Sequence, residues 1–112
     1  MEEGKPRYDL IPTEGLTEVA KLVTLCVERK GEATWRGQDP QNWSEQYNSI
    51  NRHLNKWWLE QDNDPETGIN HLAAVAFRAL VVVSQSEFYP EIKKKFDNRP
   101  VTRREKGEYD VR

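Results

Sequence analysis

Apolar side chains recur every three or four positions along two stretches of the chain, which is the spacing of one helix face. The first stretch predicts a helix over about residues 14–30 that Gly31 ends. The second predicts a helix over about residues 44–60 with Ser44 as its N-cap. Tyr47 stands where the acidic partner of a capping box is expected. No segment has the alternating pattern of a strand, so the predicted fold class is all-α.

A third helix is predicted after the turn at residues 61–68, with Asp64 as its cap, Pro65 as its first residue and its end near Ser86. Residues 72–83 are apolar on nearly every side of this helix, and such a helix is buried on most sides. A chain of 112 residues offers little interior for that burial. We therefore expect a small helical subunit, with three main helices and a C-terminal extension, that assembles into a multi-helix bundle oligomer.

The two ends of the chain differ from the helical domain, which we assign to residues 1–89. Residues 1–12 are expected to form an extended arm, because two prolines oppose helix there. The apolar side chains expected to hold this arm against the body are Tyr8, Leu10 and Ile11. Residues 90–112 form a basic C-terminal extension with a net charge of +3, whereas residues 1–89 carry −5. A short helix is expected after Pro90.

Charge and cysteine content narrow the class of protein. An acidic body attracts divalent cations and repels the nucleic-acid backbone, so nucleic acid is not an expected partner. Cys26, on the apolar face of the first helix, is the only cysteine, which excludes an intrachain disulfide and fits a reducing compartment. The polar start lacks the apolar core of a signal peptide, and residues 72–83 are too few to span a bilayer and include Arg78. We expect a cytoplasmic protein without a membrane partner.

Carboxylates gather in two places along the chain. One side of the first helix carries Glu14, Glu18 and Glu28, and the turn that follows the second helix carries Asp62, Asp64 and Glu66. Mg²⁺ and Mn²⁺ prefer oxygen ligands, and two helices that each donate carboxylates can leave coordination positions for phosphate oxygens. Surface helices are also rich in glutamate, and Asp-Asn-Asp-Pro is an ordinary turn, so the pattern leaves a metal site and a solvated surface both open.

Histidine, basic and aromatic residues add candidates with two interpretations each. His53 and His71 lack the spacing of a zinc motif, and a lone histidine on a helix usually packs inside the fold or caps it. The alternative for His71, about one turn beyond Glu66, is to orient a carboxylate or contact a phosphate. Lys30 and Arg52 either neutralise a triphosphate or lie solvated on helix surfaces. Trp35, in a glycine-rich loop, either stacks on a base or covers a small core.

Several short motifs follow one another in a familiar order and spacing. They are KPRYDLIP at residues 5–12, EVAK at 18–21, Lys30-Gly31 with Trp35, Arg52-His53-Leu54, and DNDPETGINHLA at 62–73. Over about residues 5–85 the chain resembles the phage dATP/dGTP diphosphohydrolase family, whose MazZ-like enzymes are related to MazG and the all-α NTP pyrophosphatases. The combination of the opening and the ETGxxHL element is the most specific part of this resemblance.

The resemblance implies a metal-dependent nucleotide diphosphohydrolase that cleaves purine (deoxy)nucleoside triphosphates, dGTP or GTP and dATP, to the monophosphate and pyrophosphate. It also implies two or three Mg²⁺ or Mn²⁺ ions per site and a homo-dimer or homo-tetramer. The setting would be the dNTP pool for phage DNA synthesis in the host-cell cytoplasm, with a 2-aminoadenine pathway as one case. The implied metal ligands are Glu14, Glu18, Glu28, Asp62 and Asp64, of which Glu18 and Asp64 are catalytic. The implied phosphate contacts are Lys30, Arg52 and His71, and the implied base contact is Trp35.

Two positions depart from the family pattern, and one other hypothesis competes. Gln61 stands where the family often has glutamate, so the second set of ligands is expected to begin at Glu60 or Asp62. Thr34 stands where asparagine commonly precedes the tryptophan. The competing hypothesis is a non-enzymatic helical module that binds nucleic acid or a partner protein through its basic tail, residues 90–112.

Overall fold

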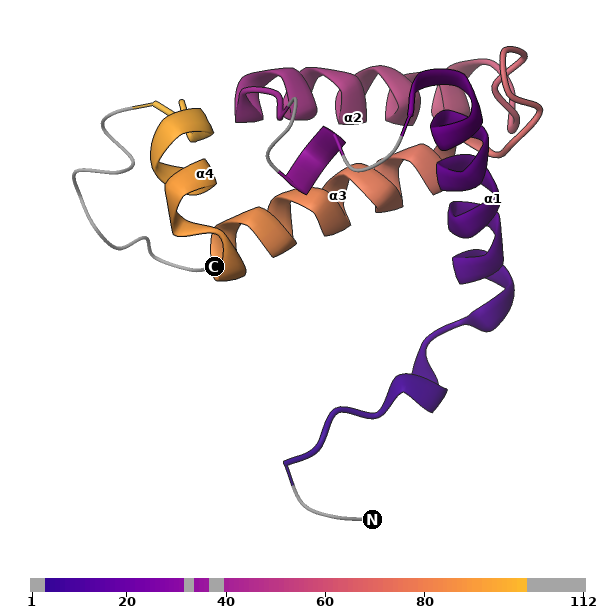
Figure 1. Cartoon of the computed structure of the whole chain (residues 1–112). Helices are drawn as coiled ribbons and strands as arrows, with labels where there is room; N and C mark the ends of the chain where they lie inside the picture. Colours follow the sequence, from indigo (N-terminus) through magenta and orange to yellow (C-terminus); the bar gives the residue numbers. More distant parts are fainter. Residues whose placement is uncertain (1–3, 32–33, 37–39, 101–112) are drawn as a thin grey trace.

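The protein is a set of four α-helices, as a computed structural model that describes residues 4–31, 34–36 and 40–100 shows (Figure 1). The helices are α1 (Thr13–Lys30), α2 (Trp43–Leu59), α3 (His71–Phe88) and α4 (Pro90–Phe96), with short 3-10 helices at Tyr8–Leu10 and Thr34–Arg36. Within the described residues there is no strand, only an isolated bridge between Asn63 and Asn70. The predicted all-α fold class is confirmed.

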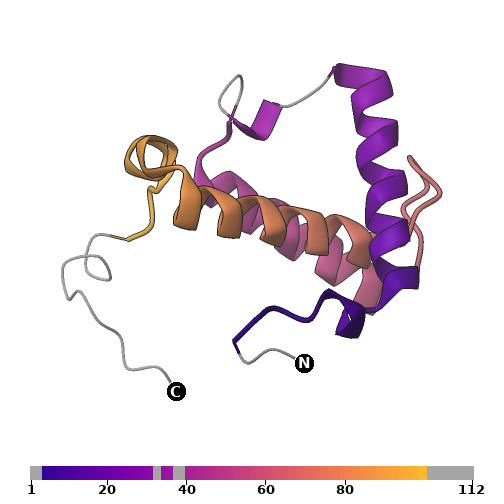
Figure 2. The same ribbon diagram turned by 60° about the horizontal axis from the view of Figure 1, so that its bottom comes forward.

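Helix α3 is the centre of the arrangement, since it contacts α1, α2 and α4. Helices α2 and α3 lie side by side and run in opposite directions, and α1 crosses the end of this pair (Figures 1 and 2). Helix α4 follows α3 after a bend of 114°. The turn between α2 and α3 therefore lies beside α1, at the end of the molecule opposite α4.

Helix α2 begins at Trp43, one residue before the predicted start, because its cap is Asn42 and not Ser44. The Glu45 side chain accepts a hydrogen bond from the Asn42 backbone N–H at 3.1 Å, which is one half of a capping box. Ser44 instead bonds with Asn98: its N–H donates to Asn98 Oδ1 at 2.9 Å, and its Oγ accepts from Asn98 Nδ2 at 2.8 Å. The predicted cap, Ser44, has Tyr47 in place of an acidic partner, whereas the observed cap, Asn42, has Glu45.

Helix α3 begins at His71, not at Pro65 as predicted. Asn70 is the cap, and its Oδ1 accepts the Leu72 N–H at 2.8 Å. Gly68 explains the difference: its φ of +75° lies in the left-handed region, so the chain turns there and no helix continues from Pro65. The predicted end of this helix near Ser86 and the short helix after Pro90 agree with the structure within two residues.

The apolar core lies between α1 and α3. Its buried members are Val19, Leu22, Ala73 and Ala74, and Cys26 packs against them as expected. The interface between α2 and α3 is different, because polar side chains are buried there together with Trp43 and Val81. Those polar residues are Gln46, Ser49, His71 and Gln85.

One expectation about burial is wrong, and a second depends on other subunits and stays a prediction. The N-terminal arm does not pack on the body: Tyr8 and Leu10 are 80% and 69% exposed, and Figure 1 shows the arm leading away from the helices. Helix α3 is not buried on most sides within one chain, since Leu80 and Val83 are about half exposed. Of the basic extension, the structure describes α4 and the segment up to Pro100, and residues 101–112 lie outside the described part.

Among the described residues, no single helix is both long and apolar enough to cross a membrane. Helices α3 and α4 together have the length and composition of a span, but they are bent by 114° relative to each other.

Candidate metal centre

The turn between α2 and α3 is organised around Asp64. Its carboxylate Oδ1 accepts the Glu66 N–H at 2.9 Å, and its carbonyl accepts the N–H groups of Thr67 and Gly68 at 3.2 and 2.7 Å. Its own N–H donates to the Ile69 carbonyl at 2.9 Å. An aspartate that bonds with its own turn in this way is held in one orientation. The turn therefore fixes the Asp64 carboxylate just before the start of α3.

His53 and His71 face each other across the α2–α3 interface. Their Nδ1 atoms are 2.9 Å apart, and His71 is only 1% exposed. This separation fits an N–H···N hydrogen bond between two neutral rings. It also fits two adjacent ligands of one cation, since nitrogens at about 2.1 Å from a metal and about 90° apart lie about 3.0 Å from each other. The pair is thus set up for a shared proton or a shared cation.

Asp64 completes a cluster with this pair. His53, Asp64 and His71 each offer one ligand atom, and these atoms all lie within 4.8 Å of one another. In the described part of the chain this is the one group of three or more histidine, cysteine or acidic side chains with such spacing. Two nitrogen donors and one carboxylate suit Mn²⁺ and other transition metals better than Mg²⁺, which prefers oxygen.

The surroundings keep His53 in the neutral form that a metal ligand requires. Burial lowers the pKa of His53 below its ordinary value, and the charge on His71 lowers it further. The Asp64 carboxylate acts in the opposite direction, while Arg78 and Lys56 add to the lowering. His53 is consequently a neutral ligand or hydrogen-bond partner at pH 7.

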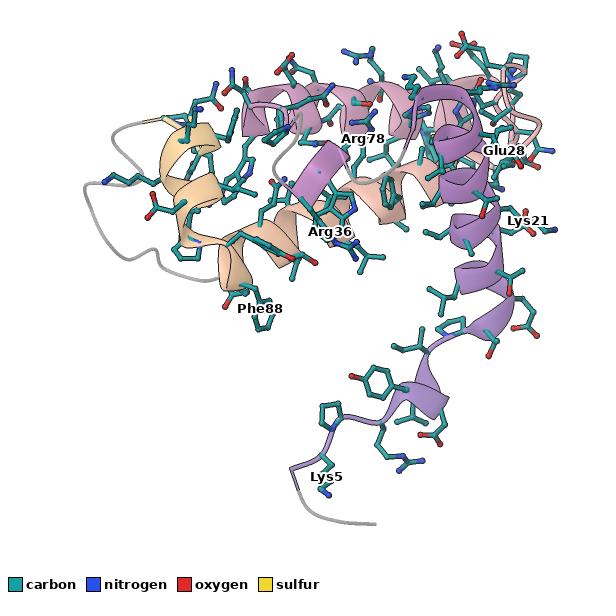
Figure 3. All side chains as sticks on the ribbon, viewed as in Figure 1. Lys5, Lys21, Glu28, Arg36, Arg78 and Phe88 are labelled. Carbon is teal, nitrogen blue, oxygen red and sulfur yellow. The ribbon has the colours of Figure 1, made fainter. Side chains whose placement is uncertain are left out.

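The predicted glutamate ligands do not join this cluster within one chain. Glu14 lies in the exposed first turn of α1, and Glu18 pairs with Lys21 at 2.9 Å. Glu28 is exposed and lines a groove of about 430 Å³ that α1 forms with Ile69 (Figure 3). The roles of these three glutamates remain predictions.

Asp62 and Asp64, the predicted ligands of the turn, take different positions. The Asp62 carbonyl accepts the His71 N–H at 2.9 Å, and Asp62 itself is exposed. Asp62 thus anchors the start of α3 through its backbone, whereas Asp64 brings its carboxylate to the histidines. Of the two, Asp64 alone is a member of the three-residue cluster.

The predicted phosphate and base contacts are spread over the molecule. Arg52 is exposed on α2 next to His53, and Lys30 is exposed at the end of α1. The carbonyl of Trp35 accepts a hydrogen bond from Gln85 at 3.0 Å, and the rings of Trp35 and Tyr89 form a T-shaped pair with centroids 6.0 Å apart. Gln85 is fourteen residues after His71, about 21 Å along α3. A single chain therefore does not bring Trp35 to a nucleotide bound at the histidines.

Sequence reasoning missed the pairing of His53 with His71 and the position of Arg78. Polar residues recur every seventh position of α3, at His71, Arg78 and Gln85, and so share one face of an otherwise apolar helix. Each contacts α2: His71 meets His53, Arg78 meets Gln46 at 2.8 Å, and Gln85 meets Trp43 at 2.9 Å. The seven-residue spacing was the signal in the sequence.

Comparison with known proteins agrees with the motifs. The model of the family described as "dATP/dGTP diphosphohydrolase, N-terminal" matches residues 1–95. No curated protein and no solved structure matches the chain significantly. The match covers most of the 112 residues, including all four helices nearly to the end of α4. The chain belongs to the dATP/dGTP diphosphohydrolase N-terminal family.

Proposed function

We propose that this protein hydrolyses purine deoxynucleoside triphosphates, dATP and dGTP first among them, to the monophosphate and pyrophosphate. The observation that carries the proposal is the cluster of His53, Asp64 and His71 at the turn, in a chain of this family. The family's description supports nucleotide hydrolysis, and the cluster supports its dependence on a divalent cation.

The donor set fits a divalent cation, and we propose Mn²⁺ as the better match than Mg²⁺. A cation held there supplies a water of lowered pKa and neutralises charge on the phosphates. The residues themselves do the positioning: the turn aims the Asp64 carboxylate, and α2 and α3 aim the two imidazoles. Glu14, Glu18, Glu28 and Asp62 stay candidates for any second or third ion.

Neutralising Asp64 tests the centre. An asparagine at this position would still accept the Glu66 N–H through its side-chain oxygen, so Asp64→Asn should keep the turn while removing the charge. We expect turnover of dGTP and dATP with Mn²⁺ to fall by about 100-fold or more. Pyrophosphate release is the measurement, with thermal unfolding to verify the fold. Glu66→Gln, the same change at an exposed residue of the turn, is the matched control.

The products decide the reaction type. Pyrophosphate with a monophosphate supports the proposal, whereas orthophosphate with a diphosphate excludes it. Full activity of Asp64→Asn with intact folding would remove the cluster from the reaction.

Metal identity gives a separate prediction. After treatment with EDTA, Mn²⁺ should restore turnover at a lower concentration than Mg²⁺, because imidazole nitrogen binds Mn²⁺ more readily than Mg²⁺. A titration of each ion against initial rate measures this order. An equal or lower requirement for Mg²⁺ would point to an all-carboxylate site and away from the histidines.

A further inference from the structure

Arg78 places a guanidinium at the interface between α2 and α3. It lies on α3, is partly buried, and extends toward α2, as Figure 3 shows. Its Nη1 donates to Gln46 Oε1 at 2.8 Å and to Gln41 Oε1 at 3.4 Å. Both acceptors are neutral amide oxygens, so neither compensates the positive charge.

The rest of the guanidinium has no acceptor among the described residues. The bonds to the two glutamines use Nη1, and neither Nε nor Nη2 makes a hydrogen bond there. The ion pairs in the described part of the chain involve other side chains, and no carboxylate pairs with Arg78. A partly buried charge without a counter-ion is costly. The edge of the guanidinium that carries Nε and Nη2, its free edge, presents two N–H groups with a spacing that matches two oxygens of a phosphate group.

A second arginine adds to the positive charge. Burial lowers the pKa of Arg78, and the charge of Arg52 lowers it further, while Cys26 has the opposite effect. The charge of Arg78 in turn contributes to the lowered pKa of His53. Two guanidinium groups and the histidine cluster therefore lie close enough to influence one another electrostatically.

The position along α3 places Arg78 within reach of a ligand of the cluster. Arg78 follows His71 by seven residues, two helical turns or about 10 Å along the axis, on the same face. Its bond to Gln46 holds the guanidinium against α2, seven residues before His53 on that helix. A chain of linked phosphates with one end at the cluster would extend toward this guanidinium.

We propose that Arg78, with Arg52 beside it, binds the phosphate chain of the substrate through the free edge of its guanidinium. This assignment rests on the proposed function and adds to it a residue of the substrate site. The ligand class is a linear polyphosphate: the triphosphate of a nucleotide or free tripolyphosphate.

Calorimetric titration with tripolyphosphate in EDTA separates this binding from the metal. The wild-type protein should bind, and Arg78→Gln should bind about tenfold more weakly or worse, because a charge-assisted pair is lost. Arg78→Lys should fall between the two, since an ammonium keeps the charge without the fork. Lys94→Gln removes an exposed charge on α4 and should bind as the wild type does. Equal affinity of Arg78→Gln and Lys94→Gln would overturn the assignment.

Two further measurements cover the case in which Arg78→Gln does not fold. Gln46→Glu keeps the size of that side chain and gives Arg78 an internal carboxylate, so tripolyphosphate binding should weaken while Arg78 stays in place. In the wild-type protein, tripolyphosphate should protect Arg78 from phenylglyoxal, as read by peptide mass spectrometry, while the exposed Arg36 still reacts. Unchanged labelling of Arg78 would contradict the proposal without any variant.

The outcomes also separate this proposal from the proposed function. Arg78-dependent binding of tripolyphosphate in a protein that hydrolyses no triphosphate would preserve the phosphate site and remove the enzyme. Release of pyrophosphate from dGTP with unchanged KM in Arg78→Gln would preserve the enzyme and remove the phosphate site.

Discussion

At the scale of single residues, the two nitrogens of His71 have different environments. Nδ1 contacts His53, whereas Nε2 is buried with no hydrogen-bond partner among the described residues. A cation on Nδ1 leaves the proton on Nε2, and a buried N–H without an acceptor costs about 1–3 kcal/mol. Histidine ligands normally donate that proton to a neighbouring acceptor. We therefore expect the centre to bind its cation reversibly and to release it readily to EDTA.

The lowered pKa of His53 makes a prediction about stability in acid. Its folded-state pKa lies below the ordinary 6.5, so the unfolded chain binds the proton more tightly. His53 then costs no stability above pH 6.5 and lowers stability as the pH falls from 6.5 through the lowered pKa. In EDTA, the melting temperature should drop between about pH 7.5 and about pH 5.5, and less so in His53→Asn. Equal drops in both proteins would contradict this role.

At the scale of elements, periodicity predicted which segments are helical but not how they begin. The stripes over 14–30 and 44–60 correspond to α1 and α2 within a residue at each end. The caps Asn42 and Asn70 were missed because several polar residues near each start can cap. Ser44, the expected cap of α2, bonds with the distant Asn98 instead. The cluster partners lie eleven and eighteen residues from His53, and that pairing depends on how α2 and α3 align.

Gln85 tests the value of the polar contacts between α2 and α3. It is completely buried, accepts from Trp43 Nε1 at 2.9 Å and donates to the Trp35 carbonyl. Gln85→Leu should destabilise the fold by about 1–3 kcal/mol, because two buried polar groups lose their partner. Adding Trp43→Phe to this variant should recover part of the lost unfolding free energy, since it removes the indole N–H that Gln85→Leu leaves without a partner. Urea unfolding of the two single variants and the double variant gives the coupling, and strict additivity would argue against this account.

At the scale of the whole molecule, one chain leaves much apolar surface exposed. Leu80, Val83 and Phe88 of α3 are 50–78% exposed, and the arm adds Tyr8 and Leu10. Val83 also lines a groove of about 980 Å³ between α2 and α3. The sequence indicated an apolar α3, yet within one chain Leu80, Val83 and Phe88 stay exposed. Oligomer formation thus remains a prediction, with a specific surface to test.

We expect the wild-type protein to elute as a dimer or tetramer and not as a 13.2 kDa monomer. Leu80→Glu and Val83→Glu should shift the elution toward the monomer, because a charge in an apolar interface is unfavourable. Asn55→Glu adds the same charge at an exposed polar position of α2 and serves as the control. Gel filtration with light scattering gives the mass. A monomeric wild type would show that Leu80 and Val83 remain exposed to solvent and form no subunit interface.

The three polar contacts between α2 and α3 also decide which alignment of the two helices can form. Because the helices are antiparallel, the pair of Gln46 and Arg78 lies seven residues before His53 on α2 and seven residues after His71 on α3. If α2 shifted by one turn against α3, His71, Arg78 and Gln85 would all lose their polar partners, whereas contacts between valine and alanine side chains would tolerate the shift. The buried polar residues therefore determine the register in which α2 packs against α3. The register of the two helices and the alignment of the candidate metal centre thus depend on the same side chains.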